Sequence, residues 1–386
     1  MRVAIVTHNV RKGDGQGRVN YELARYLLQS GVDLTLVADN VAPELVEMGA
    51  KWVEIHPAVT DVILLKVWHF QRLADRHLIE HRANYDLIMA CGVVLDQPHD
   101  VNVVHFVHRA WMDSPSHPIR TERGVGPLYQ GVFTWLNTRW EGRVLRKARR
   151  VVAVSEQIRS ELTGPVGLPA AQVSTIVNGV DIDEFIPGAM PRDELGLPEH
   201  VPLAFFAGDI RSSRKNLDSV LKALVDVPEL HLAVAGDTAG SPYPQLAKEL
   251  DVASRAHFLG FRRDVASLMQ ASDFFVFPSR YEACTLVLLE AMAVGLPVIT
   301  ARTAGGAELV GKGGYVLDDP EDVASLTKRM RALAQSPGKR EKMGRAARGI
   351  AEQHSWGAMS SQYLDLFNEV AEQHLPQQTL HPPSAR

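Results

Sequence analysis

Strand-like and helix-like segments alternate along most of this chain, and that alternation limits the folds that it can adopt. The short apolar run RVAIVTH (2–8) is typical of a buried strand, and a glycine-containing loop separates it from the helical pattern RVNYELARYLLQSG (18–31). A similar unit begins at VPLAFFAG (201–208). Alternating strands and helices are typical of parallel sheets covered by helices on both faces. We therefore predict an α/β protein with two nucleotide-binding-type halves.

The segment between the two halves contains several glycines and prolines. GPVGLPAAQVSTIVNGV (164–180) follows the strand-like RVVAVSE (150–156) and contains the turn residues expected at a domain boundary. The segment after residue 375 is rich in proline and predicts disorder. The predicted divisions are a first domain 1-166, a second domain 167-355, a C-terminal helix 356-375 and a disordered tail 376-386.

The composition is that of an ordinary globular protein. The chain has 386 residues, of which 46% are hydrophobic and 22% are charged, and its net charge is -4. This charge argues against a general nucleic-acid binder, which normally has a basic excess. We find neither a secretory signal nor a stretch long enough to span a bilayer. Two cysteines, Cys91 and Cys284, form no disulfide framework or zinc spacing, so we expect a cytoplasmic protein.

The stretch SRYEACTLVLLEAMAVGLPVIT (279–300) reads as a loop, a helix and a strand. Thr285 is suited to cap the helix, and Gly295 to end it. In parallel α/β folds, ligands bind at the carboxyl ends of strands, where helix N-termini offer free N–H groups to anions. Leu286 and Val287 would present such N–H groups to a diphosphate.

Two carboxylates, Glu282 and Glu290, lie in or beside this apolar helix. Glu290 is five residues beyond Thr285, about 7.5 Å along the helix axis, which is a reach suited to a ribose next to the diphosphate. Glu282 would face the group at the other end. The pair would thus bracket one activated sugar nucleotide, whereas the alternative for Glu290 is an exposed position on the helix edge.

The loop GDIRSSRKN (208–216) supplies positive charge after a predicted strand. Arg211, Arg214 and Lys215 could neutralise a departing diphosphate through fork-like and point-charge contacts. The alternative is a solvated basic loop, since such loops are common. The position between a strand and a helix favours the phosphate site.

The first loop contains Gly13, Gly15 and Gly17, which permit close approach of the backbone to a ligand. Together with Asp39, at the end of the second strand, these glycines also resemble a dinucleotide fingerprint. An NAD-dependent oxidoreductase is therefore an alternative from another functional class. No residues suited to hydride transfer accompany the glycines, and the two glutamates would remain unexplained.

His105 and His108 end the strand-like segment VVHFVHRAW (103–111). No third ligand has metal spacing, so we predict no metal site. The segment TWLNTRWEGRVLRKARR (134–150) combines tryptophans with basic residues. It predicts an amphipathic helix that either contacts anionic lipid or packs beside the cleft between the domains.

Several of these motifs together resemble the retaining glycosyltransferases of the sucrose-synthase-like family, glycosyltransferase family four. In that family two glutamates are separated by seven residues, as Glu282 and Glu290 are. The resemblance extends over GDGQGRVNYELARYL, VVAVSEQIRSEL, NGVDIDEF, GDIRSSRKNLD and TAGGAEL. It implies the GT-B architecture of two facing Rossmann-like domains, with the donor held by the C-terminal domain, the acceptor mainly by the N-terminal domain, and a C-terminal helix that crosses back.

Family roles can be carried over by position. Glu290 resembles the glutamate on the donor ribose, Glu282 the one near the transferred sugar, and Lys215 the lysine on the phosphates. His108 resembles the histidine that contacts the transferred sugar, and the loop 13–17 the one that covers the diphosphate. The implied catalytic residues are thus His108, Glu282 and Lys215.

The chain departs from the family pattern at two positions. Many members have an arginine directly after the glycine equivalent to Gly208, but here Asp209 stands there. Either Arg214 or Arg211 could substitute for it. The family usually has glycine at the position of Thr285, whose side chain could crowd or select the sugar.

The resemblance implies that a hexose is transferred, with retention and without a metal or other cofactor, from a UDP- or GDP-sugar. The expected acceptor is a hydroxyl of a glycan, lipid-linked or small molecule in polysaccharide or cell-envelope biosynthesis, with no nucleic acid involved. The loop around Arg214 also resembles that of lipopolysaccharide-core glucosyltransferases. A GT-B sugar-nucleotide epimerase or phosphorylase is the alternative within this fold. The expected location is cytoplasmic or peripheral on the inner face of the membrane.

Overall fold

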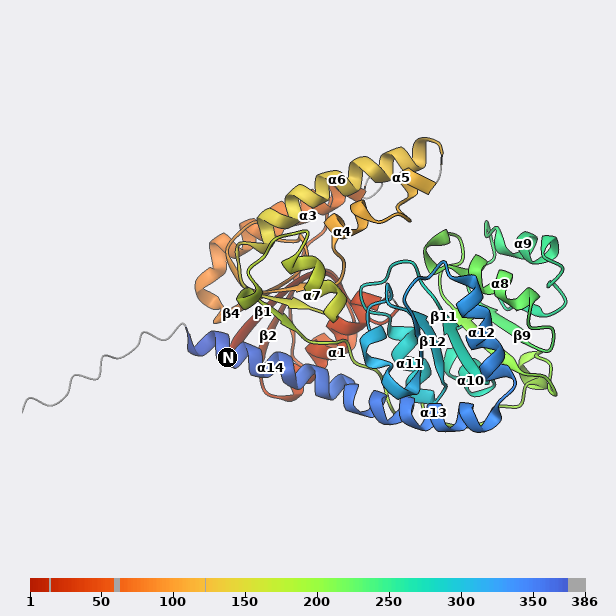
Figure 1. Ribbon diagram of the computed structural model, residues 1–386. Coiled ribbons are helices and arrows are strands. Elements are labelled where there is room, and N and C mark those ends of the chain that lie inside the picture. Colours follow the sequence, from red (N-terminus) through yellow and green to blue (C-terminus); the bar gives the residue numbers. More distant parts are fainter. Residues whose placement is uncertain (14, 59–62, 122, 374–386) are drawn as a thin grey trace, which may run out of the picture. The chain divides into compact units, whose positions relative to one another are not determined.

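The computed structural model describes residues 1–13, 15–58, 63–121 and 123–373 (Figure 1). The predicted tail 376-386 lies outside the described residues, as do the last two residues of the predicted helix 356-375. The described chain divides into two compact units. The first unit comprises residues 1–102, 147–150 and 360–373, and the second comprises 103–146 and 151–359.

The first of two sheets has seven strands in the order β3-β2-β1-β4-β5-β6-β7. Their bounds are Arg2–Val10 (β1), Asp33–Val41 (β2), Lys51–Glu54 (β3), Leu87–Cys91 (β4), His99–Val104 (β5), Ala148–Ala153 (β6) and Val173–Thr175 (β7). The central strand β1 pairs in parallel with β2, where Val3 lies opposite Leu34, and with β4, where Val3 lies opposite Leu87. Continuous apolar runs such as β1 and β4 are expected where helices cover both faces of a parallel sheet.

Among the described residues, four helices belong wholly or largely to the first unit: Gly15–Gln29 (α1), Pro43–Glu47 (α2), Ile63–His81 (α3) and Trp356–Glu372 (α14). The residues of α14 from Ser360 onward group with the first unit, as expected for a C-terminal helix that crosses back. Arg150 of β6 forms an ion pair with Glu369 of α14.

The second sheet has six strands in the order β10-β9-β8-β11-β12-β13, and each neighbouring pair is parallel. Their bounds are Leu203–Ala207 (β8), His231–Ala235 (β9), Ala256–Phe258 (β10), Phe274–Phe277 (β11), Val298–Ala301 (β12) and Gly314–Leu317 (β13). Strand β8 packs through Phe205 and Phe206 against Phe275 and Phe277 of β11, and all four rings are fully buried. The two predicted Rossmann-like parallel sheets are confirmed.

The helices around the second sheet are Leu217–Val225 (α8), Tyr243–Glu249 (α9), Val265–Gln270 (α10), Leu286–Val294 (α11), Val323–Ala334 (α12) and Pro337–Ala351 (α13). The second unit also contains His108–Asp113 (α4), Pro118–Thr121 (α5), Val125–Leu145 (α6) and Glu156–Thr163 (α7). Short 3-10 turns lie at Arg82–Asn84, Ala170–Gln172, Asp193–Leu195, Ser213–Lys215, Ala307–Leu309, Gly311–Gly313 and Glu352–His354. Helix α11 packs against β11 and β12, which places its N-terminus at the carboxyl ends of the strands (Figure 1).

The change from one sheet to the other falls between Thr175 and Leu203, whereas the compact units assign residues 103–146 to the second unit. The predicted domain bounds 1-166 and 167-355 therefore stay predictions.

The prediction of a single helix over 134–150 is wrong. Helix α6 ends at Leu145, and Ala148–Ala153 forms strand β6, because Val151 to Ala153 pair with β7. The basic residues at the end of the segment hold other parts of the chain: Lys147 contacts Asp96, and Arg146 donates to the carbonyl oxygen of Val166. Within the described ranges, no helix has the length and apolarity needed to cross a membrane.

Candidate functional site

A cavity of about 390 Å³ lies at the carboxyl ends of β8 and β9. Gly208 and Gly236, which directly follow these strands, line it. A Cβ atom on Gly236 would lie 2.4 Å from the carbonyl oxygen of Gly208, so this close approach requires glycine. Val287 and Glu290 of α11 line the same cavity. A cavity thus lies where the sequence predicts the site, at strand ends beside a helix N-terminus.

The start of α11 differs in one respect from the prediction. Thr285 is the N-cap residue, as predicted, and Leu286 is the first helical residue, but the Thr285 side chain makes no capping hydrogen bond. The N–H group of Thr285 donates to the carbonyl oxygen of Gly305 at 3.0 Å, and that of Gly305 donates to the carbonyl oxygen of Glu282 at 2.8 Å. The neighbouring TAGGAEL loop therefore holds this segment through its backbone. The hydroxyl of Thr285 is buried and has no hydrogen-bond partner among the described residues.

Glu282 forms ion pairs with two cations of the loop 208–216, Lys215 and Arg214. Its Oε1 accepts hydrogen bonds from Lys215 Nζ at 2.5 Å and from Arg214 Nη1 at 2.6 Å. Burial lowers the pKa of Lys215, whereas the charge of Glu282 opposes that shift. Lys215 also lies 5.2 Å from the centre of the Phe277 ring and lines the cavity. These contacts join Glu282 to the cavity wall, although Glu282 itself is not part of that wall.

Arg211 behaves differently from Arg214. Its Nε donates to Asp209 Oδ1 at 2.9 Å, and this bond holds the pKa of Asp209 below its usual range. Arg211 and Asp209 both line the cavity. Asp209, which stands where many family members have an arginine, is thus paired with Arg211, whereas Arg214 lies beside Lys215 and Glu282.

Glu290 lies on the cavity side of α11, one turn beyond Val287. Its neighbours Leu289 and Ala291 are fully buried, whereas Glu290 is half-buried. The side chain therefore lies at the cavity wall, where a ribose hydroxyl could reach it.

His108 begins helix α4 in the second unit. Its backbone N–H donates to Glu141 Oε1 at 2.9 Å, and that of Arg109 donates to Glu141 Oε2 at 3.2 Å. Burial lowers the pKa of His108 to about 4, so its imidazole is neutral near pH 7. Its Nδ1 has no hydrogen-bond partner in the described parts of the chain. A neutral imidazole can accept or donate a hydrogen bond to a sugar hydroxyl.

Sequence reasoning missed Tyr281, which connects the Glu282 segment to the His108 segment. Its hydroxyl donates to Glu161 Oε2 at 2.9 Å and lies 3.4 Å from the carbonyl oxygen of Val107. Its ring centre is 5.2 Å from that of Trp111. No local pattern could have revealed these contacts, because the partners are more than 100 residues apart in the sequence.

Sequence reasoning also missed part of the cavity wall that follows β10. Phe261, Arg262 and Val265 line the cavity. The sequence could have indicated these residues, since LGFRRD directly follows the short strand AHF and the carboxyl ends of strands in a parallel sheet lie at one edge. These residues add an aromatic ring and a guanidinium to the site.

Gly15 and Gly17 lie in the first turn of α1, in the first unit. Their predicted contact with a diphosphate stays a prediction. No group of three or more His, Cys, Asp or Glu side chains that could hold a metal is found within residues 1–13, 15–58, 63–121 and 123–373.

Two parallel sheets covered by helices, with a cavity beside a helix N-terminus, agree with the GT-B architecture. Residues 13–184 match the family model described as Glycosyltransferase Family 4, and residues 191–350 match that of Glycosyl transferases group 1. The two matches together cover most of the chain, which therefore belongs to this family of glycosyltransferases. The alternative of an NAD-dependent oxidoreductase is not supported.

Named relatives agree with this family. A D-inositol 3-phosphate glycosyltransferase of Catenulispora acidiphila is 31% identical over 254 residues, which are 60% of this chain and 58% of that protein. The chain thus matches less than two thirds of the length of the first curated relatives.

Solved structures agree on the fold. A sucrose-phosphate synthase from Thermosynechococcus elongatus is similar with a TM-score of 0.79 at 18% identity, over 96% of this chain and 99% of that one. The Anabaena protein HepE, solved in complex with UDP and glucose, is similar with a TM-score of 0.68 at 20% identity, over 95% of this chain and 99% of that one.

Proposed function

We propose that this chain transfers a hexose from a UDP- or GDP-sugar to an acceptor hydroxyl. The observation that carries this proposal is the grouping of Lys215, Val287 and Glu290 around one cavity at the start of α11. The helix N-terminus and Lys215 would hold the diphosphate, and Glu290 the ribose. The structure of HepE with UDP and glucose supports UDP as the first nucleotide to try.

We further propose that the anomeric configuration is retained and that no metal is required. Lys215 and Arg214 would stabilise the negative charge that develops as the diphosphate leaves, a role that a divalent ion plays in other enzymes. Glu282 orients both cations through its Oε1. His108, neutral and with a free Nδ1 among the described residues, would bind a hydroxyl of the transferred sugar.

For the acceptor we propose a hydroxyl of a glycan, a lipid-linked or a small molecule, in polysaccharide, lipopolysaccharide or other cell-envelope synthesis. Helix α6 exposes Val125, Leu128, Val132 and Trp135, which suits a cytoplasmic enzyme that contacts the inner face of a membrane. No nucleic acid is involved in this proposal.

Incubation with a panel of UDP- and GDP-sugars, with and without acceptors and with EDTA, tests the proposal. We expect an acceptor-dependent product of retained configuration that EDTA does not abolish. A new nucleotide sugar formed without acceptor would instead establish an epimerase, and strict dependence on phosphate a phosphorylase. Binding without turnover of any donor would contradict the transferase proposal.

A further inference from the structure

Both cations beside Glu282 lie on one short turn whose backbone conformation is unusual. Ser213–Lys215 is a single 3-10 turn, and the next residue, Asn216, has φ 63° and ψ 37° in the left-handed region. Asparagine adopts this region more readily than other non-glycine residues, so Asn216 suits the end of the turn. The positions of Arg214 and Lys215 depend on the contacts that hold the turn.

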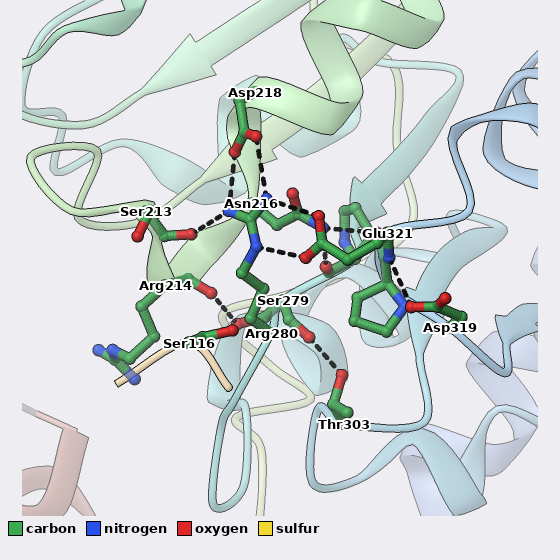
Figure 2. Close-up of polar contacts among 12 residues, drawn as sticks. Ser116, Ser213, Arg214, Asn216, Asp218, Ser279, Arg280, Thr303, Asp319 and Glu321 are labelled. Carbon is green, nitrogen blue, oxygen red and sulfur yellow. Dashed lines mark hydrogen bonds and ion pairs between the residues drawn. The ribbon is translucent and has the colours of Figure 1, made fainter. Parts of the chain in front are cut away.

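Arg280, two residues before Glu282, makes the principal contacts with the carbonyl groups of this turn (Figure 2). Its Nη1 donates to the carbonyl oxygen of Ser213 at 2.5 Å, and its backbone N–H donates to that of Arg214 at 2.9 Å. Ser279 Oγ donates to the same Arg214 oxygen at 3.0 Å. One short segment thus fixes the carbonyl oxygens of two consecutive turn residues.

Asn216 strengthens the same attachment from the end of the turn. Its Nδ2 donates to the carbonyl oxygen of Pro278 at 2.9 Å and to that of Pro320 at 2.7 Å. The turn and the residue after it are therefore joined through Ser213, Arg214 and Asn216 to the segment that leads into Glu282.

The charge of Arg280 is already compensated, so it is not available to a phosphate. Asp218 accepts two hydrogen bonds from the guanidinium, at 2.8 and 2.9 Å, and Glu321 accepts two more, at 2.5 and 2.9 Å (Figure 2). The side chain is only 10% exposed, and Arg280 is not among the described residues that line the cavity of about 390 Å³. It lines a second cavity, of about 770 Å³, but there its guanidinium is already bound to Asp218 and Glu321. These contacts fit a residue that holds the turn in place.

We propose that Arg280 is a positioning residue that sets Arg214 and Lys215 for the diphosphate of the donor. This inference rests on the proposed function, since it concerns the same donor site. The guanidinium is planar and has five N–H donors in fixed directions, so it can donate to two carboxylates and a carbonyl oxygen at the same time. A lysine ammonium has only three donors, all on one atom, and could not make all of these hydrogen bonds. Loss of the fork would let the turn shift without removing any group that touches the donor.

The test compares the binding affinities of Arg280→Lys and of the wild type for two probes, the diphosphate UDP and its nucleoside uridine. If the wild type prefers GDP, the probes are GDP and guanosine. Affinities are measured by calorimetry for the diphosphate and by ligand-observed NMR for the nucleoside. We expect the diphosphate affinity to fall about tenfold and the nucleoside affinity to stay within twofold. A general structural defect would weaken both probes alike.

Arg348→Lys is the matched control. Arg348 donates to the carbonyl oxygens of Phe185 and Ala293 and pairs with Glu352, so it is another half-buried arginine that holds backbone, away from the turn. Its substitution should lower the melting temperature and leave the ratio of the two affinities unchanged. If Arg280→Lys does not fold, the same affinities are measured for Glu321→Gln. This substitution removes only one charged partner of Arg280, so the diphosphate affinity should fall about threefold.

The outcomes separate the two proposals. An unchanged diphosphate affinity in the folded variants, or an equal loss for diphosphate and nucleoside, would overturn the role of Arg280 and leave the proposed function in place. Failure of the wild type to bind either diphosphate would overturn both.

Discussion

The surroundings of Glu282 and those of His108 hold their ionisable groups in opposite charge states. Glu282, Lys215 and Arg214 are half-buried together, so opposite charges lie within hydrogen-bond distance of each other. Glu141 is buried and His108 is half-buried, and neither has a charged partner of opposite sign among the described residues. Burial shifts His108 and Glu141 toward their neutral forms, with pKa values of about 4 and about 7. The region around Glu282 therefore balances its charges, whereas the region around His108 presents neutral hydrogen-bonding groups.

The largest expected effect comes from the charge-balanced region. Lys215→Ala removes a cation from the proposed phosphate site and should lower kcat/KM for the donor by about 10² to 10³, as loss of a preorganised transition-state contact does. Steady-state kinetics on a UDP- or GDP-sugar measures this. Lys51→Ala, which removes an exposed ion pair with Asp33, is the control and should leave turnover unchanged. Equal turnover of the two variants would remove Lys215 from the mechanism.

The next effect concerns Glu141 and the free energy of unfolding. Because burial raises its folded pKa to about 7, the native state holds a proton that the unfolded state releases between about pH 4.5 and 7. Stability therefore falls as pH rises through this window, by up to about 3 kcal/mol. Glu141→Gln removes this titration, so its stability relative to wild type should rise between pH 5 and pH 8.

Urea unfolding at the two pH values, with the exposed Glu341→Gln as control, measures the Glu141 effect. A difference between variant and wild type that stays the same at pH 5 and pH 8 would show that Glu141 is charged in the folded protein.

His108 should give an effect of opposite sign with pH. Its folded pKa of about 4 lies below the ordinary value of 6.5, so the unfolded state binds the proton first as pH falls. Stability contributed by neutral His108 is then lost between about pH 6.5 and 4, by up to about 3 kcal/mol. His108→Asn should lose less stability on acidification than wild type, whereas the exposed His200→Asn should not differ from it.

The smallest effect is expected at Glu290. Glu290→Ala removes one hydrogen-bonding carboxylate from the cavity wall and should raise the KM for the donor about tenfold, or about 1.4 kcal/mol, without lowering the melting temperature. Donor titrations in the kinetic assay measure this. An unchanged KM would place the ribose elsewhere.

Much of the fold and part of the site could be predicted from sequence, because they depend on local patterns. The alternation of strands and helices predicted both parallel sheets, and Gly295 marked the end of α11. The strand-to-helix position of GDIRSSRKN predicted Lys215 near the strand ends, where it lines the cavity, since the strand ends of a parallel sheet share one edge.

The rest depends on contacts between distant residues. Arg280 meets Asp218 and Glu321 across 62 and 41 residues, and Glu141 meets His108 across 33. The tryptophans and arginines of 134–150 suggested one helix, but pairing of β6 with β7 ended it. A local sequence pattern does not show which distant residues pair with each other. The contacts of Arg280 and the end of α6 could therefore be found only from the structure.

A crystal structure with a nucleoside-diphosphate sugar bound tests the central claim most directly. We expect the diphosphate at the start of α11 within hydrogen-bond distance of Lys215, and the ribose on Glu290. A donor bound in another cavity, with neither side chain in contact with it, would show that this cavity is not the donor site.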